Sequence, residues 1–170
     1  MQPATGAQPA PVFKAGDMAV HPAHGVGEVL RIEERQLGPR KDAFYVLRIE
    51  GSGNRVMVAV DAAASVGLRP VMSPDQALEV LQILRAPEVA VDAQPWTRRH
   101  RIYQEMLKSG SPFEIAKVLR DMHRLKGDKD LSFGERRLLD QARSLLVHEL
   151  ALAQNVQRSE VEGELRSIFS

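Results

Sequence analysis

The pattern of hydrophobic and polar positions changes period near the middle of the chain. From Val12 to Arg69, short β-branched runs alternate with turn residues, which is typical of antiparallel strands. The expected strands are Met18–Val20, Gly25–Ile32, Phe44–Ile49 and Val56–Val60, with turns at Pro22, at Gly38-Pro39 and across residues 51–54. Four or five strands in about sixty residues are too few for two packed sheets, so the pattern favours a small antiparallel barrel.

After Pro70 the apolar positions recur every three to four residues, as expected for helices packed on a core. Four candidate helix starts carry a capping box, in which an N-cap serine precedes Glu or Gln by three residues: Ser73–Gln76, Ser111–Glu114, Ser132–Glu135 and Ser159–Glu162. A further helix is expected to begin near Trp96, after Pro95, and to end before Gly110. The predicted apolar faces consist of Leu78, Leu81 and Leu84; Ile115, Val118, Leu119 and Met122; and Leu138, Leu139, Ala142, Leu145, Leu146 and Leu150.

These patterns predict an α+β fold in which an all-β part precedes an all-α part. Residues 1–11 are uncharged and contain three of the ten prolines, so they are predicted to form a disordered tail. Residues 12–70 are expected to form the barrel and residues 71–170 a compact five-helix bundle. A short link, from Arg69 to Ser73, would join the two domains.

Composition and missing motifs narrow the function by exclusion. The 170 residues are 44% hydrophobic and 26% charged, which is typical of a soluble globular protein, and the net charge of +1 excludes a general polycation. The chain has no cysteine, and its apolar runs are far shorter than the ~20 residues of a membrane span, so a cytoplasmic location without membrane contact is expected. Phosphate-binding loops, zinc-peptidase motifs and nucleophile elbows are absent from the sequence.

Two histidines, His21 and His24, are the only close pair that could share a metal, and no third ligand lies near them in the sequence. They are therefore interpreted as turn histidines whose ring nitrogens are bonded locally. We expect no catalytic residues, no metal and no cofactor, so the sequence predicts a protein that is not an enzyme.

Basic residues concentrate in one window of the helical half. Residues 96–143 hold twelve Lys and Arg against seven Asp and Glu, a local balance of +5. Trp96, the only tryptophan, precedes Arg98, Arg99 and Arg101 at a helix start, where arginines and free backbone N–H groups can bind phosphates. A second basic pair, Arg136-Arg137, lies in a first helical turn, where the helix dipole disfavours cations.

The alternative is that these residues are structural. Trp96 could anchor the core, the arginines could form a solvated face, and Phe133 is best interpreted as a hydrophobic staple residue rather than as part of an exposed surface. The residues alone leave the choice for Trp96 open.

Six motifs in order make the chain similar to the CarD/CdnL family of bacterial RNA polymerase-binding transcription regulators. They are Phe13-Lys14-Ala15-Gly16-Asp17, residues 21–27 (HPAHGVG), Tyr45-Val46-Leu47, Val66-Gly67-Leu68-Arg69, Trp96-Thr97-Arg98-Arg99 and residues 127–137 (GDKDLSFGERR). The sequence has Ala59 where many relatives have proline and His100 where many have tyrosine, and it lacks a long basic extension with AT-hooks. The resemblance is therefore to the shorter, CdnL type.

The resemblance implies a Tudor-like barrel, related to the polymerase-binding module of transcription-repair coupling factors, that docks on the polymerase β subunit. The implied polymerase contacts are Arg35, Arg55, Met57 and Val58. The helical domain would lie at the upstream edge of the promoter bubble, where Trp96 wedges into the minor groove. The implied backbone contacts are Arg98, Arg99, Arg101 and Arg136, and the basic pair adds Arg137.

The leading hypothesis is a monomeric transcription regulator that binds polymerase, associates with the nucleoid through it, and stabilises the open promoter complex, for example at ribosomal RNA promoters, without reading base sequence. The alternative is a protein–protein adaptor that links polymerase to another regulator and makes no DNA contact.

Overall fold

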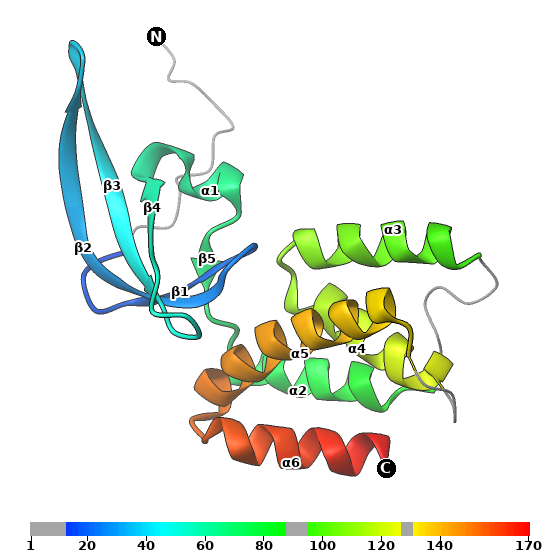
Figure 1. Ribbon diagram of the computed structural model, residues 1–170. Coiled ribbons are helices and arrows are strands. Elements are labelled where there is room, and N and C mark those ends of the chain that lie inside the picture. Colours follow the sequence, from blue (N-terminus) through cyan, green and yellow to red (C-terminus); the bar gives the residue numbers. More distant parts are fainter. Residues whose placement is uncertain (1–12, 88–94, 127–130) are drawn as a thin grey trace, which may run out of the picture.

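The computed structural model describes residues 13–87, 95–126 and 131–170. The predicted disordered tail, residues 1–11, lies outside these ranges, as does part of the 127–137 motif. Strands come first and helices follow, so the predicted α+β class is confirmed (Figure 1). None of the helices within the described ranges is long and apolar enough to cross a membrane.

The N-terminal domain is built on a five-stranded antiparallel sheet. Its strands are β1 (Met18–His21), β2 (Gly25–Leu37), β3 (Arg40–Ile49), β4 (Arg55–Ala59) and β5 (Arg69–Pro70), in the order β4-β3-β2-β1-β5. All four predicted strands are present. β2 and β3 extend further than predicted, because their polar outer parts pair in an uninterrupted register from Arg31↔Val46 to Leu37↔Arg40. Closure of the sheet into a barrel stays a prediction.

One face of this sheet forms a core of its own. The Phe13 and Tyr45 rings pack edge to face with their centres 5.5 Å apart, and both residues are at most 4% exposed. A short 3-10 turn (Val60–Ala62) and α1 (Ala63–Val66), which the sequence did not predict, connect β4 to β5. Gly67, with φ +97°, ends α1 in the left-handed conformation that glycine adopts at little cost.

Five helices of the described chain make up the C-terminal domain: α2 (Pro74–Arg85), α3 (Trp96–Lys108), α4 (Pro112–Lys126), α5 (Phe133–Gln154) and α6 (Arg158–Phe169). Complete capping boxes at Ser73 and Ser132 confirm two predicted starts, and at α4 the Glu114 N–H donates to the Ser111 hydroxyl. The predicted box at Ser159 is wrong, because the N-cap of α6 is Gln157, two residues earlier.

The helices share a second core, which contains almost all of the predicted apolar faces. Leu78 is an exception: it is 58% exposed, and α2 turns Ala77, Val80 and Leu81 inward instead. Within this core the Tyr103 hydroxyl donates to Asp121 at 3.0 Å, and burial together with the carboxylate raises the pKa of Tyr103. The hydroxyl is therefore held in its protonated, donating form.

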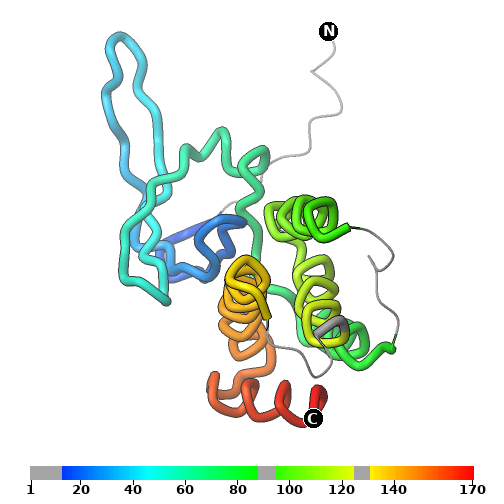
Figure 2. Tube along the Cα trace, turned by 45° about the vertical axis from the view of Figure 1, so that its right-hand side comes forward, coloured from blue at the N-terminus to red at the C-terminus, as the bar shows by residue number. Residues whose placement is uncertain are grey.

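The two domains pack directly on each other. A Cβ built on Gly110 would lie 2.9 Å from Pro22 Cβ, and one on Gly51 would lie 3.2 Å from the His148 ring. Figures 1 and 2 show the sheet on one side of the molecule, the helices on the other, and the β2–β3 hairpin pointing away from the helices. The sheet and the helices are therefore in direct contact through these residues.

Candidate functional site

Trp96 lies where the first turns of α3 and α5 meet. The ring centres of its half-buried indole and of His100 lie 5.2 Å apart in an edge-to-face arrangement, and the Arg99 guanidinium lies 5.6 Å from the centre of the indole ring. On α5, a Cβ at Gly134 would lie 3.7 Å from Trp96 Cζ2, an ordinary van der Waals contact, so the start of α5 packs beside the indole. The side chain packs against the helical core while part of it stays open to solvent. Trp96 is thus partly a core residue, and the rest of its side chain is open to a partner.

The three arginines after Trp96 have different surroundings. Arg98 and Arg101 are exposed and, with Thr97, line a shallow hollow beside the helix start. Arg99 is half-buried against the indole, and its Nε is buried with no hydrogen-bond partner among the described residues. Arg98 and Arg101 are thus placed to reach a ligand in solvent, whereas Arg99 is placed to support Trp96.

The start of α5 contributes an exposed aromatic ring and two more cations. Phe133 is 79% exposed, so its interpretation as a staple residue is wrong. The Arg137 guanidinium lies 5.9 Å from the Phe133 ring centre, and Arg136 is exposed beside them. We call the set Trp96, Arg98, Arg101, Phe133, Arg136 and Arg137 the helix-start patch.

Other cations of the basic window serve the fold instead. Arg120 is 6% exposed and contacts Asp121 at 3.2 Å, and Lys117 pairs with Glu114 at 3.3 Å. The Arg124 Nη2 donates to the Leu84 and Arg85 carbonyls at 3.4 and 3.2 Å, joining α4 to the end of α2. The charge balance of the window therefore overstates the number of cations available to a ligand.

The predicted polymerase contacts lie on the sheet. Residues directly opposite each other in neighbouring strands share a face. Met57 is opposite Val46, which is opposite Arg31, and Arg55 is opposite Arg48. Because side chains alternate along a strand, Arg35 lies on the same face as Arg31. We call this surface the outer sheet face.

Val58 is placed differently from the other three. Its side chain points into the core beside Tyr45 and is 4% exposed. β4 ends the sheet order, so Val58 can meet a partner through its backbone rather than through its side chain.

Three of the four arginines named on the outer sheet face contact acids, and no ion pair of the fourth, Arg55, lies among the described residues. The Glu33 carboxylate accepts hydrogen bonds from Arg35 at 2.7 Å and from Arg31 at 3.0 Å, and these bonds lower the pKa of the Glu33 carboxyl. Arg48 contacts Glu28 at 2.7 Å, across neighbouring strands. The named charges of this face are four arginines and two acids, a balance of +2, against +4 for the four arginines of the helix-start patch.

The predicted local bonding of a ring nitrogen is confirmed for His21 of the histidine pair. The His21 Nδ1 accepts a hydrogen bond from the Ala23 N–H at 3.0 Å, and the two rings lie 4.7 Å apart. Within the described ranges, no group of three His, Asp or Glu side chains could hold a metal ion.

Comparison with known proteins assigns the chain to a family. Residues 13–72 match the family model "CarD-like/TRCF RID domain", and residues 79–166 match "CarD, C-terminal domain". A putative transcription factor of Bacillus subtilis, YdeB, is 30% identical over 152 residues, which cover 89% of this chain and 99% of that protein. A solved N-terminal domain, CdnLNt from Myxococcus xanthus, is 44% identical over 41% of this chain and 96% of its own, with a TM-score of 0.32. This chain therefore belongs to the CarD/CdnL family of RNA polymerase-interacting transcription factors.

Proposed function

We propose that this protein binds the RNA polymerase β subunit through its outer sheet face and edge strand β4, and holds promoter DNA at the upstream fork of the bubble with the helix-start patch. The result is a longer-lived open complex. The observation that carries the proposal is the partly exposed Trp96, which packs against Arg99 and His100 and is flanked by the exposed Arg98 and Arg101.

The patch has the chemistry of a wedge with phosphate contacts. An indole inserted at a base step replaces lost stacking, and arginines around it pair with backbone phosphates. The N-terminal ends of α3 and α5 add free backbone N–H groups to the same field. A fork that is already unwound costs less to unstack than straight duplex, so the patch should favour the open complex.

Tethering makes a weak DNA contact sufficient. Polymerase binding raises the effective concentration of the patch at the fork. A preference for the open over the closed complex of ~1.4–2.8 kcal/mol shifts their ratio about ten- to hundredfold. The proposed contacts are a stacking wedge and phosphate pairs, which carry no base-edge readout, so promoter selectivity should follow bubble stability.

The decisive experiment measures open-complex lifetime on a ribosomal RNA promoter with polymerase alone, with wild-type protein and with Trp96→Ala. Wild type should lengthen the lifetime about tenfold or more, and Trp96→Ala should lose this effect at unchanged polymerase affinity. Phe113→Ala is a matched control, because Phe113 also packs half-buried against the helical core but lies at the start of α4. A Trp96→Ala protein that still lengthens the lifetime would sink the proposal.

A second candidate function, the protein–protein adaptor, is favoured by the 79% exposed ring of Phe133. In that case Phe133→Ala should abolish binding of a protein regulator while Trp96→Ala leaves the open-complex lifetime unchanged.

A further inference from the structure

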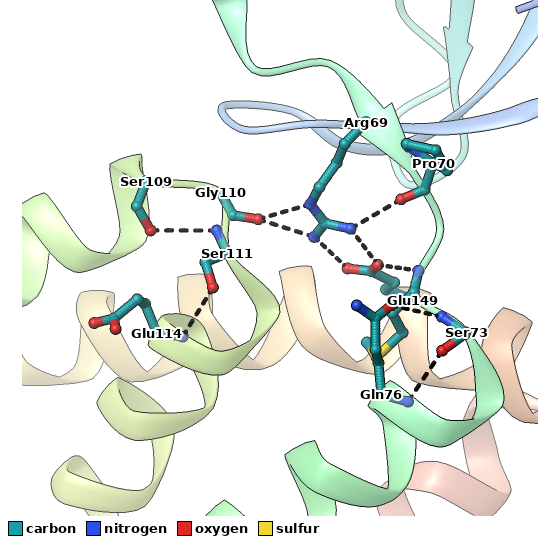
Figure 3. Close-up of polar contacts among 10 residues, drawn as sticks. Arg69, Pro70, Ser73, Gln76, Ser109, Gly110, Ser111, Glu114 and Glu149 are labelled. Atoms are coloured by element: carbon teal, nitrogen blue, oxygen red, sulfur yellow. Dashed lines mark hydrogen bonds and ion pairs between the residues drawn. The ribbon is translucent and has the colours of Figure 1, made fainter. Parts of the chain in front are cut away.

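Arg69 joins the two domains with every nitrogen of its guanidinium (Figure 3). The side chain comes from β5, the last strand of the sheet. Its Nε and Nη2 donate to the Gly110 carbonyl at 3.0 and 2.9 Å, and Nη1 also donates to the Pro70 carbonyl at 3.1 Å. Nη1 and Nη2 bind the two oxygens of Glu149 at 2.6 and 2.7 Å, which makes the ion pair bidentate.

Glu149 is a buried carboxylate, so its charge needs a close partner. Its side chain is 2% exposed, on the part of α5 that packs into the helical core. The same carboxylate accepts the Met72 N–H at 2.8 Å, at the entry to α2. A carboxylate is tolerated at such burial when its charge and lone pairs are matched, and the planar guanidinium fork supplies that match.

Gly110 connects this contact to α3, the helix that carries Trp96 of the helix-start patch. It directly follows the last turn of α3, has φ +74°, and lies against Pro22 of the β1–β2 turn. Arg69 thereby fixes the C-terminal end of the helix that carries Trp96 at its N-terminal end.

A small rotation between the domains at Gly110 would produce a large displacement of Trp96. The 13 residues of α3 span about 20 Å at ~1.5 Å per residue. A rotation of about 10° at Gly110 would move Trp96 by roughly 3.5 Å, which is close to the ~3.4 Å spacing of charges along one DNA strand. A wedge that must meet one base step while the sheet is bound to polymerase therefore needs a fixed joint.

We propose that Arg69 and Glu149 are positioning residues that fix the helix-start patch relative to the outer sheet face, so that polymerase binding delivers Trp96 to one place on the DNA. This inference rests on the proposed function for its consequence in transcription. The fixed orientation itself can be measured without polymerase.

The test compares Arg69→Lys, which keeps the charge but loses the fork, with the double variant Arg69→Met/Glu149→Leu, which leaves no unpaired charge. Arg85→Lys is the matched control, since Arg85 pairs with Glu164 at 3.5 Å inside the helical domain. The chain has no cysteine, so Ala64→Cys on α1 and Gln104→Cys on α3, both exposed, can carry spin labels for distance measurement by double electron–electron resonance.

We expect a single narrow distance distribution in wild type and Arg85→Lys, and a broadened one in both Arg69 variants. The increase in open-complex lifetime should be at least about fivefold smaller with the Arg69 variants than with wild type, while their polymerase affinity stays unchanged. Narrow distributions in both Arg69 variants, or broad ones with the full lifetime gain, would overturn the inference. If Trp96→Ala retains the full gain, the proposed function fails, and the distance distributions alone then decide whether Arg69 fixes the domains.

Discussion

The outer sheet face and the helix-start patch are both rich in arginine, but their arginines have different partners. On the sheet, Arg31 and Arg35 share Glu33, and Arg48 contacts Glu28. At the helix starts, no described acid forms an ion pair with Arg98 or Arg136, and Arg137 lies over an aromatic ring.

The difference shows which partner each surface suits. Pre-paired charges fix a pattern with a smaller net field, and such a pattern selects a protein surface of complementary pattern. Unpaired cations create a net positive field, which attracts a polyanion whatever its sequence. Arginine content alone would have treated the two surfaces as equivalent.

The largest effect should come from reversing charge in the patch. Arg98→Glu combined with Arg136→Glu replaces two phosphate contacts with two repulsions, so affinity for fork DNA should fall about a hundredfold. Polymerase affinity should stay within about twofold. Fluorescence anisotropy with labelled fork DNA measures the first quantity.

A control of equal net charge is Lys108→Glu with Arg166→Glu, since both residues are exposed on the helical domain away from the patch. Equal losses in both double variants would mean that DNA senses net charge rather than the patch.

Raising the salt concentration should weaken DNA binding by the patch more than polymerase binding by the sheet, with a somewhat smaller effect than charge reversal. Three to four phosphate contacts give a log–log slope of about −3, so raising salt from about 50 to about 200 mM should weaken fork binding roughly sixtyfold. Polymerase binding, made by pre-paired charges and strand-edge hydrogen bonds, should weaken less than about tenfold. Parallel titrations of both partners check this, and equal slopes would contradict the comparison.

The smallest effect concerns the junction between the domains. Burial, together with Arg158, lowers the pKa of His148, and burial, together with His24, lowers the pKa of His21. Glu50 acts in the opposite direction on His148. The folded protein thus binds fewer protons than the unfolded chain. The resulting stability is complete above the ordinary value of 6.5 and is lost as pH falls through the lower folded pKa.

The melting temperature should therefore decrease between about pH 7.5 and about pH 5.5. His148→Gln, which keeps an acceptor for the Arg158 hydrogen bond, should reduce this decrease. A melting temperature that rises on acidification would contradict the assigned protonation of both rings.

Much of the fold could be predicted because local signals were strong. The capping boxes at Ser73 and Ser132 and the Pro95–Gly110 limits of α3 each satisfy backbone groups within a few residues. Ser159 misled because only residues 155–157 separate α5 from α6, and Asn155, with φ +56°, turns the chain early. The long β2–β3 hairpin was underestimated because its outer rows are charged rather than alternating in hydrophobicity.

The candidate site was predicted in part, and the rest depends on tertiary contacts. Sequence spacing gave the cluster around Trp96 but not the inward direction of Arg99 or Val58, which helix phase and strand register decide. The Arg69–Glu149 pair spans 80 positions and has no local signature. One signal was available: Glu149 interrupts an otherwise apolar stripe beside Leu146 and Leu150, and an acid in that position needs a cation.

The contact of Pro22 with Gly110 also limits how the domains of relatives can be exchanged. A hybrid protein could take its sheet from one relative and its helices from another, and each half would keep its own core. Pro22 and Arg69 would then come from one parent, and Gly110 and Glu149 from the other. Any side chain at position 110 would push Pro22 away, because even a Cβ would lie 2.9 Å from it. The two domains of this protein are therefore exchangeable only together with their matched surfaces.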